Sequence, residues 1–170
     1  MIKIGGRGSE MFFHAPAIID IKGTLVLNGI VEIGNGCLLR VEENGKLIFG
    51  NKVRIGAFSK IICEESITFG NEIDVSWESQ IFDTNFHYIK EVNTEKILPK
   101  TAPVIIGSYN WFGNRANIMK GTITPDNTII ASNSLLNKNY TNTPPYSVLA
   151  GTPAKFIRSG VKRMFEGVDL

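Results

Sequence analysis

A six-residue spacing of apolar side chains is the feature that most restricts what this chain can fold into. In the second half of the sequence the spacing is strict, with a threonine as its one lapse, in the row Ile106, Phe112, Ile118, Thr124, Ile130 and Leu136. Small or short polar side chains stand four positions after the first five members, at Asn110, Ala116, Thr122, Thr128 and Ser134. A period of six fits neither the 3.6-residue repeat of a helix nor the two-residue alternation of a strand.

The same spacing occurs earlier, in Phe49 and Ile55 and then in Phe69, Val75 and Ile81, with a two-residue slip before Phe69 that predicts one longer corner. Glycine often follows the leading residue, at Gly34, Gly50, Gly56, Gly70, Gly107 and Gly113, which suits a positive φ or a close backbone approach. We expect each hexad to form a short strand and a turn, with the leading and small residues pointing inward. A single coil cannot bury its own apolar face, so the pattern predicts an all-β stack of parallel coils.

Length, charge and hydropathy narrow the class of protein further. The chain has 170 residues, the size of one domain, and its net charge of +2 gives no electrostatic reason to bind nucleic acid or an acidic membrane. No apolar run approaches the roughly 18 residues that cross a bilayer, so we expect no membrane insertion. The first seven residues lack the apolar core of a secretory signal, and we therefore expect a cytoplasmic location.

Cysteine and histidine are scarce. Cys37 and Cys63 could form one disulfide at most, and without a secretion signal we expect two reduced thiols, with Cys37 facing the interior. The two histidines, His14 and His87, show no close ligand pairing with the cysteines. We therefore expect no metal site, and we expect His14, which lies outside the repeat, to be structural or exposed.

Rows of the form [Leu/Ile/Val]-Gly-x-x-[small]-x resemble the hexapeptide-repeat acyltransferases, and the resemblance covers approximately residues 30–158. It implies a left-handed parallel β-helix with triangular coils, one projecting loop and a short C-terminal helix. On this basis we expect a lead-in or cap over residues 1–29, the β-helix over 30–153 with an inserted loop at about 84–103, and a C-terminal helix or tail over 154–170.

The regular rows stop for 24 residues after Ile81, and a histidine stands near the start of this interval. An imidazole that titrates near neutral pH can take a proton from a hydroxyl, although a lone histidine is more often a packed or solvated side chain. The string from Asp83 to His87 resembles the Asp-x-[Asp/Asn]-x-His segment of sugar-acetylating family members, which implies that His87 is the catalytic base. Asp83 and Asn85 share a face with His87 on an extended segment, so either could orient the ring.

The resemblance also implies a coenzyme site. The string Ala150-Gly151-Thr152-Pro153-Ala154-Lys155-Phe156-Ile157-Arg158 resembles the family's terminal signature, in which basic residues meet the phosphates of coenzyme A. Lys155 and Arg158 are neighbours if a helical turn follows Pro153, and a solvated charged helix face is the alternative. Main-chain groups near Asn114 would face the thioester, Ser132 and Asn137 would touch the pantetheine arm, and Trp111 is either a wall of the acyl site or an interface aromatic.

Taken together, the resemblance implies an acetyl-CoA-dependent O-acetyltransferase that acts on a hydroxyl of a sugar or surface-polysaccharide precursor. It implies direct transfer in a ternary complex, without a covalent acyl-enzyme, and a homotrimer with sites between subunits. Two alternatives remain open: an N-acetyltransferase acting on a nucleotide-linked amino sugar, and a β-helix that binds or scaffolds without catalysis. The acceptor, the acyl chain length and the role of residues 1–29 are not determined by the sequence.

Overall fold

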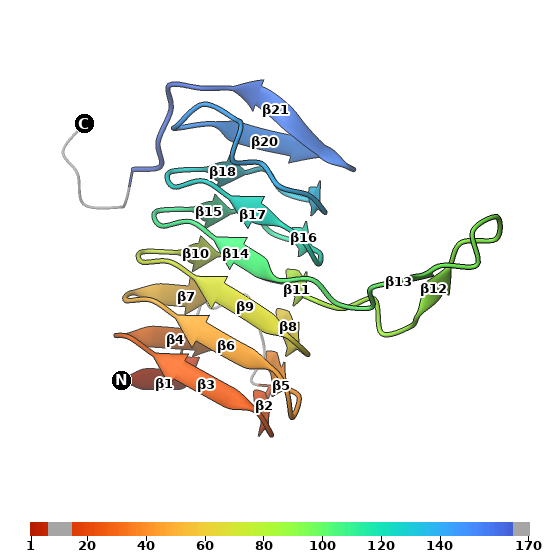
Figure 1. The fold of residues 1–170 in the computed structure, drawn as a ribbon. Coiled ribbons are helices and arrows are strands. Elements are labelled where there is room, and N and C mark those ends of the chain that lie inside the picture. The colour runs from red at the N-terminus through yellow and green to blue at the C-terminus, as the bar shows by residue number, and fades with distance from the viewer. Residues whose placement is uncertain (7–14, 165–170) are drawn as a thin grey trace.

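The computed structural model describes residues 1–6 and 15–164, and these residues form a parallel β-solenoid of about six coils (Figure 1). The coils form three sheets, which we call A, B and C, and a fourth sheet of two strands lies outside the stack. Apart from β20 (Val148–Gly151) with β21 (Ala154–Arg158) and β12 (Ile89–Lys90) with β13 (Ile97–Leu98), the paired strands run parallel, so each coil stacks on the one before it. His14 lies outside the described residues, as do residues 165–170 of the expected C-terminal segment.

Each sheet takes one strand from successive coils. Sheet A contains β1 (Ile2–Gly6), β4 (Val31–Gly34), β7 (Val53–Ile55), β10 (Asp74–Val75), β15 (Trp111–Phe112), β18 (Ile129–Ile130), β20 (Val148–Gly151) and β21 (Ala154–Arg158). Sheet B contains β2 (Ile18–Ile21), β5 (Leu38–Val41), β8 (Lys60–Cys63), β11 (Gln80–Phe82), β16 (Asn117–Ile118) and β19 (Leu135–Leu136). Sheet C contains β3 (Thr24–Leu27), β6 (Lys46–Phe49), β9 (Ser66–Phe69), β14 (Val104–Ile106) and β17 (Ile123–Thr124).

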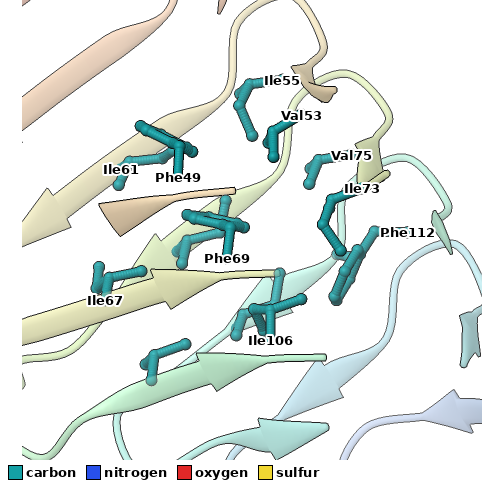
Figure 2. Close-up of a cluster of buried hydrophobic side chains, with 14 of the residues drawn as sticks. Phe49, Val53, Ile55, Ile61, Ile67, Phe69, Ile73, Val75, Ile106 and Phe112 are labelled. Carbon is teal, nitrogen blue, oxygen red and sulfur yellow. The ribbon is translucent and has the colours of Figure 1, made fainter. Parts of the chain in front are cut away.

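The interior confirms the hexad rows. Every leading residue of the strict row is at most 3% exposed, including Thr124, and the small residues four positions later are equally buried. Aligned leading residues stack from coil to coil, and the rings of Phe49 and Phe69 lie parallel with centroids 4.9 Å apart (Figure 2). The buried polar members are hydrogen-bonded inside the stack; for example, the Asn110 side chain donates to Thr124 Oγ1 at 2.6 Å and accepts from the Thr128 amide at 2.6 Å.

Close backbone approach and positive φ, the two features that the glycines suggested, occur at different positions of the corners. The glycines after the leading residues are places of close approach: a Cβ on Gly56 would lie 2.7 Å from the Trp77 amide nitrogen, and one on Gly113 would lie 2.5 Å from that of Ser132. Positive φ occurs instead three positions after the leading residues, at Lys52, Phe58, Glu72, Glu78, Tyr109, Arg115, Asn127 and Asn133. None of these residues is glycine, so the stacked coils hold their backbone in a conformation that L-residues rarely adopt.

The slip between Ile61 and Phe69 was expected to mark a longer corner, and that expectation is wrong. The corner between β8 and β9 contains only Glu64 and Glu65. The slip arises because both strands have four residues and bury two side chains each, Ile61 with Cys63 and Ile67 with Phe69.

Two segments depart from the stack. Residues 84–103, which we call the arm, project from the solenoid and contain the antiparallel strands β12 (Ile89–Lys90) and β13 (Ile97–Leu98) (Figure 1). At the other end, the expectation of a helical turn after Pro153 is wrong, because Ala154–Arg158 form strand β21, which pairs with β20. The described residues contain no helix, and hence none with the length and apolar character needed to cross a membrane.

Candidate active site

A groove of about 490 Å³ lies where the strands of sheet A end and the chain turns toward sheet B. It brings together three residues that the sequence nominated for coenzyme contacts, Trp111, Asn114 and Ser132. Trp111 is on β15, and the other two stand in the corners that follow β15 and β18. The Ser132 hydroxyl donates to Asn114 Oδ1 at 2.6 Å, so the two side chains are held against each other across adjacent coils.

The floor of the groove carries an ionic cluster that the sequence reasoning missed. Asp74 on β10 is 6% exposed, and its carboxylate accepts hydrogen bonds from Arg54 Nε at 2.9 Å, from Arg54 Nη2 at 2.5 Å and from Arg163. Burial is the largest single influence on the Asp74 pKa and raises it, but the two guanidinium groups together outweigh burial and bring the pKa below its ordinary value of 3.8. The carboxylate is therefore ionised at neutral pH.

The positions of two members of this ionic cluster, Arg54 and Asp74, follow from the six-residue repeat. Arg54, Asp74 and Trp111 each stand immediately before a leading residue of a hexad, so the register predicts one row on the outer face of a sheet. The structure pairs Asp74 with Arg54 on one side and with Trp111 on the other. Arg163 had no such signal, because it is 89 residues from Asp74 and outside the hexads.

His87 lies at the start of the arm, just beyond the end of β11 in sheet B, and its side chain is exposed. The chain leaves the three stacked sheets A, B and C, which we call the wall, through a tight turn. In this turn the Phe86 amide donates to Thr84 Oγ1 at 2.9 Å, and Phe86 takes a φ of 63°. The Asn85 amide pairs with the Lys100 carbonyl at 3.0 Å, which joins the two ends of the arm. Within the described residues, no hydrogen bond holds the imidazole in place.

Asp83 does not fit the role of orienting His87. Its side chain is fully buried, and its two carboxylate oxygens accept three backbone hydrogen bonds of 2.7–2.8 Å from Glu64, Glu65 and Ser66. These amides form the corner between β8 and β9, so the carboxylate holds the neighbouring coil. Of the two candidates, half-buried Asn85 is the one whose side chain is not committed to the wall.

The remaining nominated residues lie elsewhere. Asn137 follows β19 at the corner after sheet B, the same edge of the solenoid as His87, and is exposed. Lys155 and Arg158 are exposed on β21, paired with Ala150 and Val148 across an irregularity in register. Because those partners are two residues apart on β20, both basic side chains lie on one face of the sheet, the arrangement that a helical turn was expected to provide.

Both cysteines are buried free thiols, and Cys37 faces the interior as expected. Burial, and then the charge and hydrogen bond of Asp83, raise the pKa of Cys63 to about 12. No group of three or more His, Cys, Asp or Glu side chains within residues 1–6 and 15–164 is arranged to hold a metal ion.

Comparison with known proteins gives relatives named as acetyltransferases, whereas no protein-family model matches the chain. A putative lipopolysaccharide biosynthesis O-acetyl transferase, WbbJ of Escherichia coli K12, is 25% identical over 151 residues, which are 84% of this chain and 76% of that protein. A polysialic acid O-acetyltransferase of Escherichia coli O1:K1 is 26% identical over 120 residues, 70% of this chain but only 38% of its own length.

Solved structures share the fold over almost the whole chain. The polySia-specific acetyltransferase NeuO superposes with a TM-score of 0.68 at 19% identity, covering 99% of this chain and 85% of its own. AntD of Bacillus cereus, an N-acyltransferase solved with dTDP and 3-hydroxybutyryl-CoA, superposes with a TM-score of 0.68 at 16% identity, covering 93% and 79%. The hexad register and the three-sided solenoid are features of hexapeptide-repeat β-helix proteins, and together with these relatives they identify the chain as an acyltransferase.

Proposed function

We propose that this acyltransferase moves an acetyl group from acetyl-CoA to a hydroxyl of a sugar or surface-polysaccharide precursor. The observation that carries the proposal is the groove that brings together Trp111, Asn114 and Ser132, residues from three different hexads that the sequence predicted to lie at the coenzyme site. The names of the relatives, which include lipopolysaccharide and polysialic acid O-acetyltransferases, support the choice of acceptor.

In the proposed reaction, the acceptor oxygen attacks the thioester carbonyl while His87 takes the hydroxyl proton. The carbon–sulfur bond then breaks, the acetyl group remains on the acceptor oxygen, and the imidazolium returns its proton to the leaving thiolate. A backbone N–H near Asn114 would stabilise the oxyanion, an effect worth about 3 kcal/mol for each donor in acyl transfer. Transfer is direct, since both thiols are buried and the raised pKa of Cys63 keeps it protonated at neutral pH.

The active unit in this proposal is a homotrimer with each site between two copies. His87 and Asn114 lie at opposite edges of sheet B, so a second copy can supply the groove that faces the imidazole. The arm supports this arrangement, because Tyr88 is 73%, Val92 88% and Ile97 61% exposed on a hairpin that is too small to be stable by itself. Lys155 and Arg158, both exposed on one face of β21, are proposed to meet the coenzyme phosphates, and Asn137 the pantetheine arm.

The test is a pair of substitutions at one position. We expect His87→Ala to lower turnover at least about a hundredfold, since general base catalysis supplies 10²–10⁴-fold. His87→Gln, which can hydrogen-bond but cannot accept the proton at working pH, should be impaired to the same degree. Calorimetry should give an unchanged acetyl-CoA dissociation constant for both variants. Near-normal turnover in either variant would remove His87 from the mechanism.

Transfer to the amino group of a nucleotide-linked sugar is the second candidate, favoured by the fold shared with AntD. The two reactions differ in their product. An acetyl ester is cleaved by neutral hydroxylamine, whereas an acetyl amide survives, so the stability of the product on a hydroxyl and on an amino acceptor separates them. A chain that binds no acetyl-CoA in calorimetry would instead be a non-catalytic scaffold.

A further inference from the structure

The segment that follows β21 returns along the solenoid instead of leaving it. Residues 159–164, which we call the strap, descend beside the stack toward β15 (Figure 1). The Val161 amide donates to the Tyr146 carbonyl at 3.2 Å, and Lys162, Arg163 and Met164 line a hollow of about 310 Å³. The strap is therefore packed on the outer face of sheet A, beside the groove.

Arg163 is the residue through which the strap reaches the groove. Its guanidinium carbon lies 5.1 Å from the centre of the Trp111 ring, and the same guanidinium pairs with the Asp74 carboxylate. Its side chain is 24% exposed, against 59% for Arg54 on the other side of Asp74. Arg163 also lines the groove together with Asn114 and Ser132.

These contacts restrain the indole from one side. Trp111 is on a strand of only two residues and is half-buried, so sheet A alone does not enclose the indole ring. A guanidinium stacked on an indole contributes about 0.5–2 kcal/mol, and the ion pair with buried Asp74 fixes where the guanidinium lies. Lysine cannot reproduce both contacts, because an ammonium has neither the plane nor the fork of donors.

We propose that Arg163 is a positioning residue for acyl transfer: held by Asp74, it fixes the Trp111 indole as a wall of the groove. This inference rests on the proposed function, and it makes the strap, which lies outside the hexad repeat, part of the site. The contact with Arg163 decides between the two roles that were open for Trp111, in favour of a groove wall.

The first measurement needs no ligand or activity. The chain has two tryptophans, so Trp77→Phe leaves Trp111 as the only indole. In that background we expect Arg163→Gln to raise acrylamide quenching of Trp111 about twofold or more, with Arg163→Lys in between. Equal quenching with and without Arg163→Gln would overturn the proposal, because the indole would then be held by the wall alone.

The second measurement uses the otherwise unmodified full chain. Arg163→Gln should raise the KM and the dissociation constant for acetyl-CoA about three- to tenfold, within the range of one cation–π contact, with a smaller change in kcat. Lys52→Gln, which removes the same charge from the exposed pair with Glu72, is the matched control and should change neither constant. Increased quenching with unchanged constants would overturn the groove-wall role. Failure of the wild-type chain to bind acetyl-CoA would refute the proposed function, and the quenching comparison would still decide whether Arg163 fixes the indole.

Discussion

The solenoid wall and the arm obtain their order in different ways. In the wall, every strand except those at the ends of the sheets pairs with a neighbouring strand on both sides, and the side chains that point into the solenoid are almost wholly buried. The arm has two paired strands of two residues each, and Tyr88, Val92 and Ile97 on it are mostly exposed. The wall therefore contributes most of the free energy of unfolding, whereas the arm, which carries His87, contributes little. A substitution should affect folding in one region and assembly or turnover in the other.

The largest expected effect is a core deletion in the wall. Phe69 is 2% exposed and stacks on Phe49 at 4.9 Å, so Phe69→Ala should lower the free energy of unfolding by about 3–5 kcal/mol. Denaturant unfolding followed by circular dichroism measures the change. Tyr88→Ala on the arm removes a side chain of similar size that is 73% exposed, and should cost less than about 0.5 kcal/mol. Similar losses for both variants would contradict the distinction between wall and arm.

The next effect lies where the arm joins the wall. Asp83→Asn leaves one carbonyl oxygen and an NH₂ group facing the three amides of Glu64, Glu65 and Ser66. We expect a loss of about 2 kcal/mol in the free energy of unfolding, because charge-assisted hydrogen bonds to buried groups contribute about 1.5–3 kcal/mol. Asp126→Asn is the matched control, since this exposed carboxylate accepts a single amide hydrogen bond from Ser108, at 2.7 Å. Lower turnover with unchanged stability would instead return Asp83 to the role of orienting His87.

The wall was predictable from the sequence because its information is local and periodic. Within the strict row, the six-residue spacing indicates which side chain points inward, and the burial of Phe112, Ile118 and Thr124 follows from it. The same register places Arg54 and Asp74 at outward-facing positions of sheet A, where apolar periodicity gives no signal. What the sequence could not show depends on distant partners: β21 is a strand because β20 lies beside it, and Arg163 meets Asp74 across 89 residues.

Asp83 illustrates the same limit at the site. The sequence correctly placed it near His87 along the chain, and an extended segment would put both on one face. The chain turns at Phe86, however, and the carboxylate is drawn inward by amides that lie 17–19 residues earlier. Spacing alone cannot reveal such a competition, because the competing donors belong to another coil.

A smaller effect on stability, with a larger one on assembly, is expected from the arm. Tyr88→Ser combined with Val92→Ser should weaken association of the copies by at least about tenfold, measured by sedimentation velocity. At dilutions where both proteins are monomers, the free energy of unfolding should change by less than about 0.5 kcal/mol. Lys90→Ser with Glu95→Ser removes two exposed polar side chains from the same arm and should preserve association. A wild-type chain that remains monomeric at working concentration would remove the trimer and its shared site.

The smallest expected effect tests whether the ion pair between Asp74 and Arg163 holds the Trp111 indole in the groove. The pKa of Asp74 lies below its ordinary value of 3.8, so its contribution to stability is complete above 3.8 and is lost as the pH falls through the lowered value. In the Trp77→Phe background, the Trp111 emission should therefore stay constant from neutral pH to about 4 and change only in more acid solution, when the carboxylate releases Arg163. Asp74→Asn should abolish that acid step, because an amide cannot titrate. A step that persists in Asp74→Asn would show that other carboxylates in the wall hold the indole.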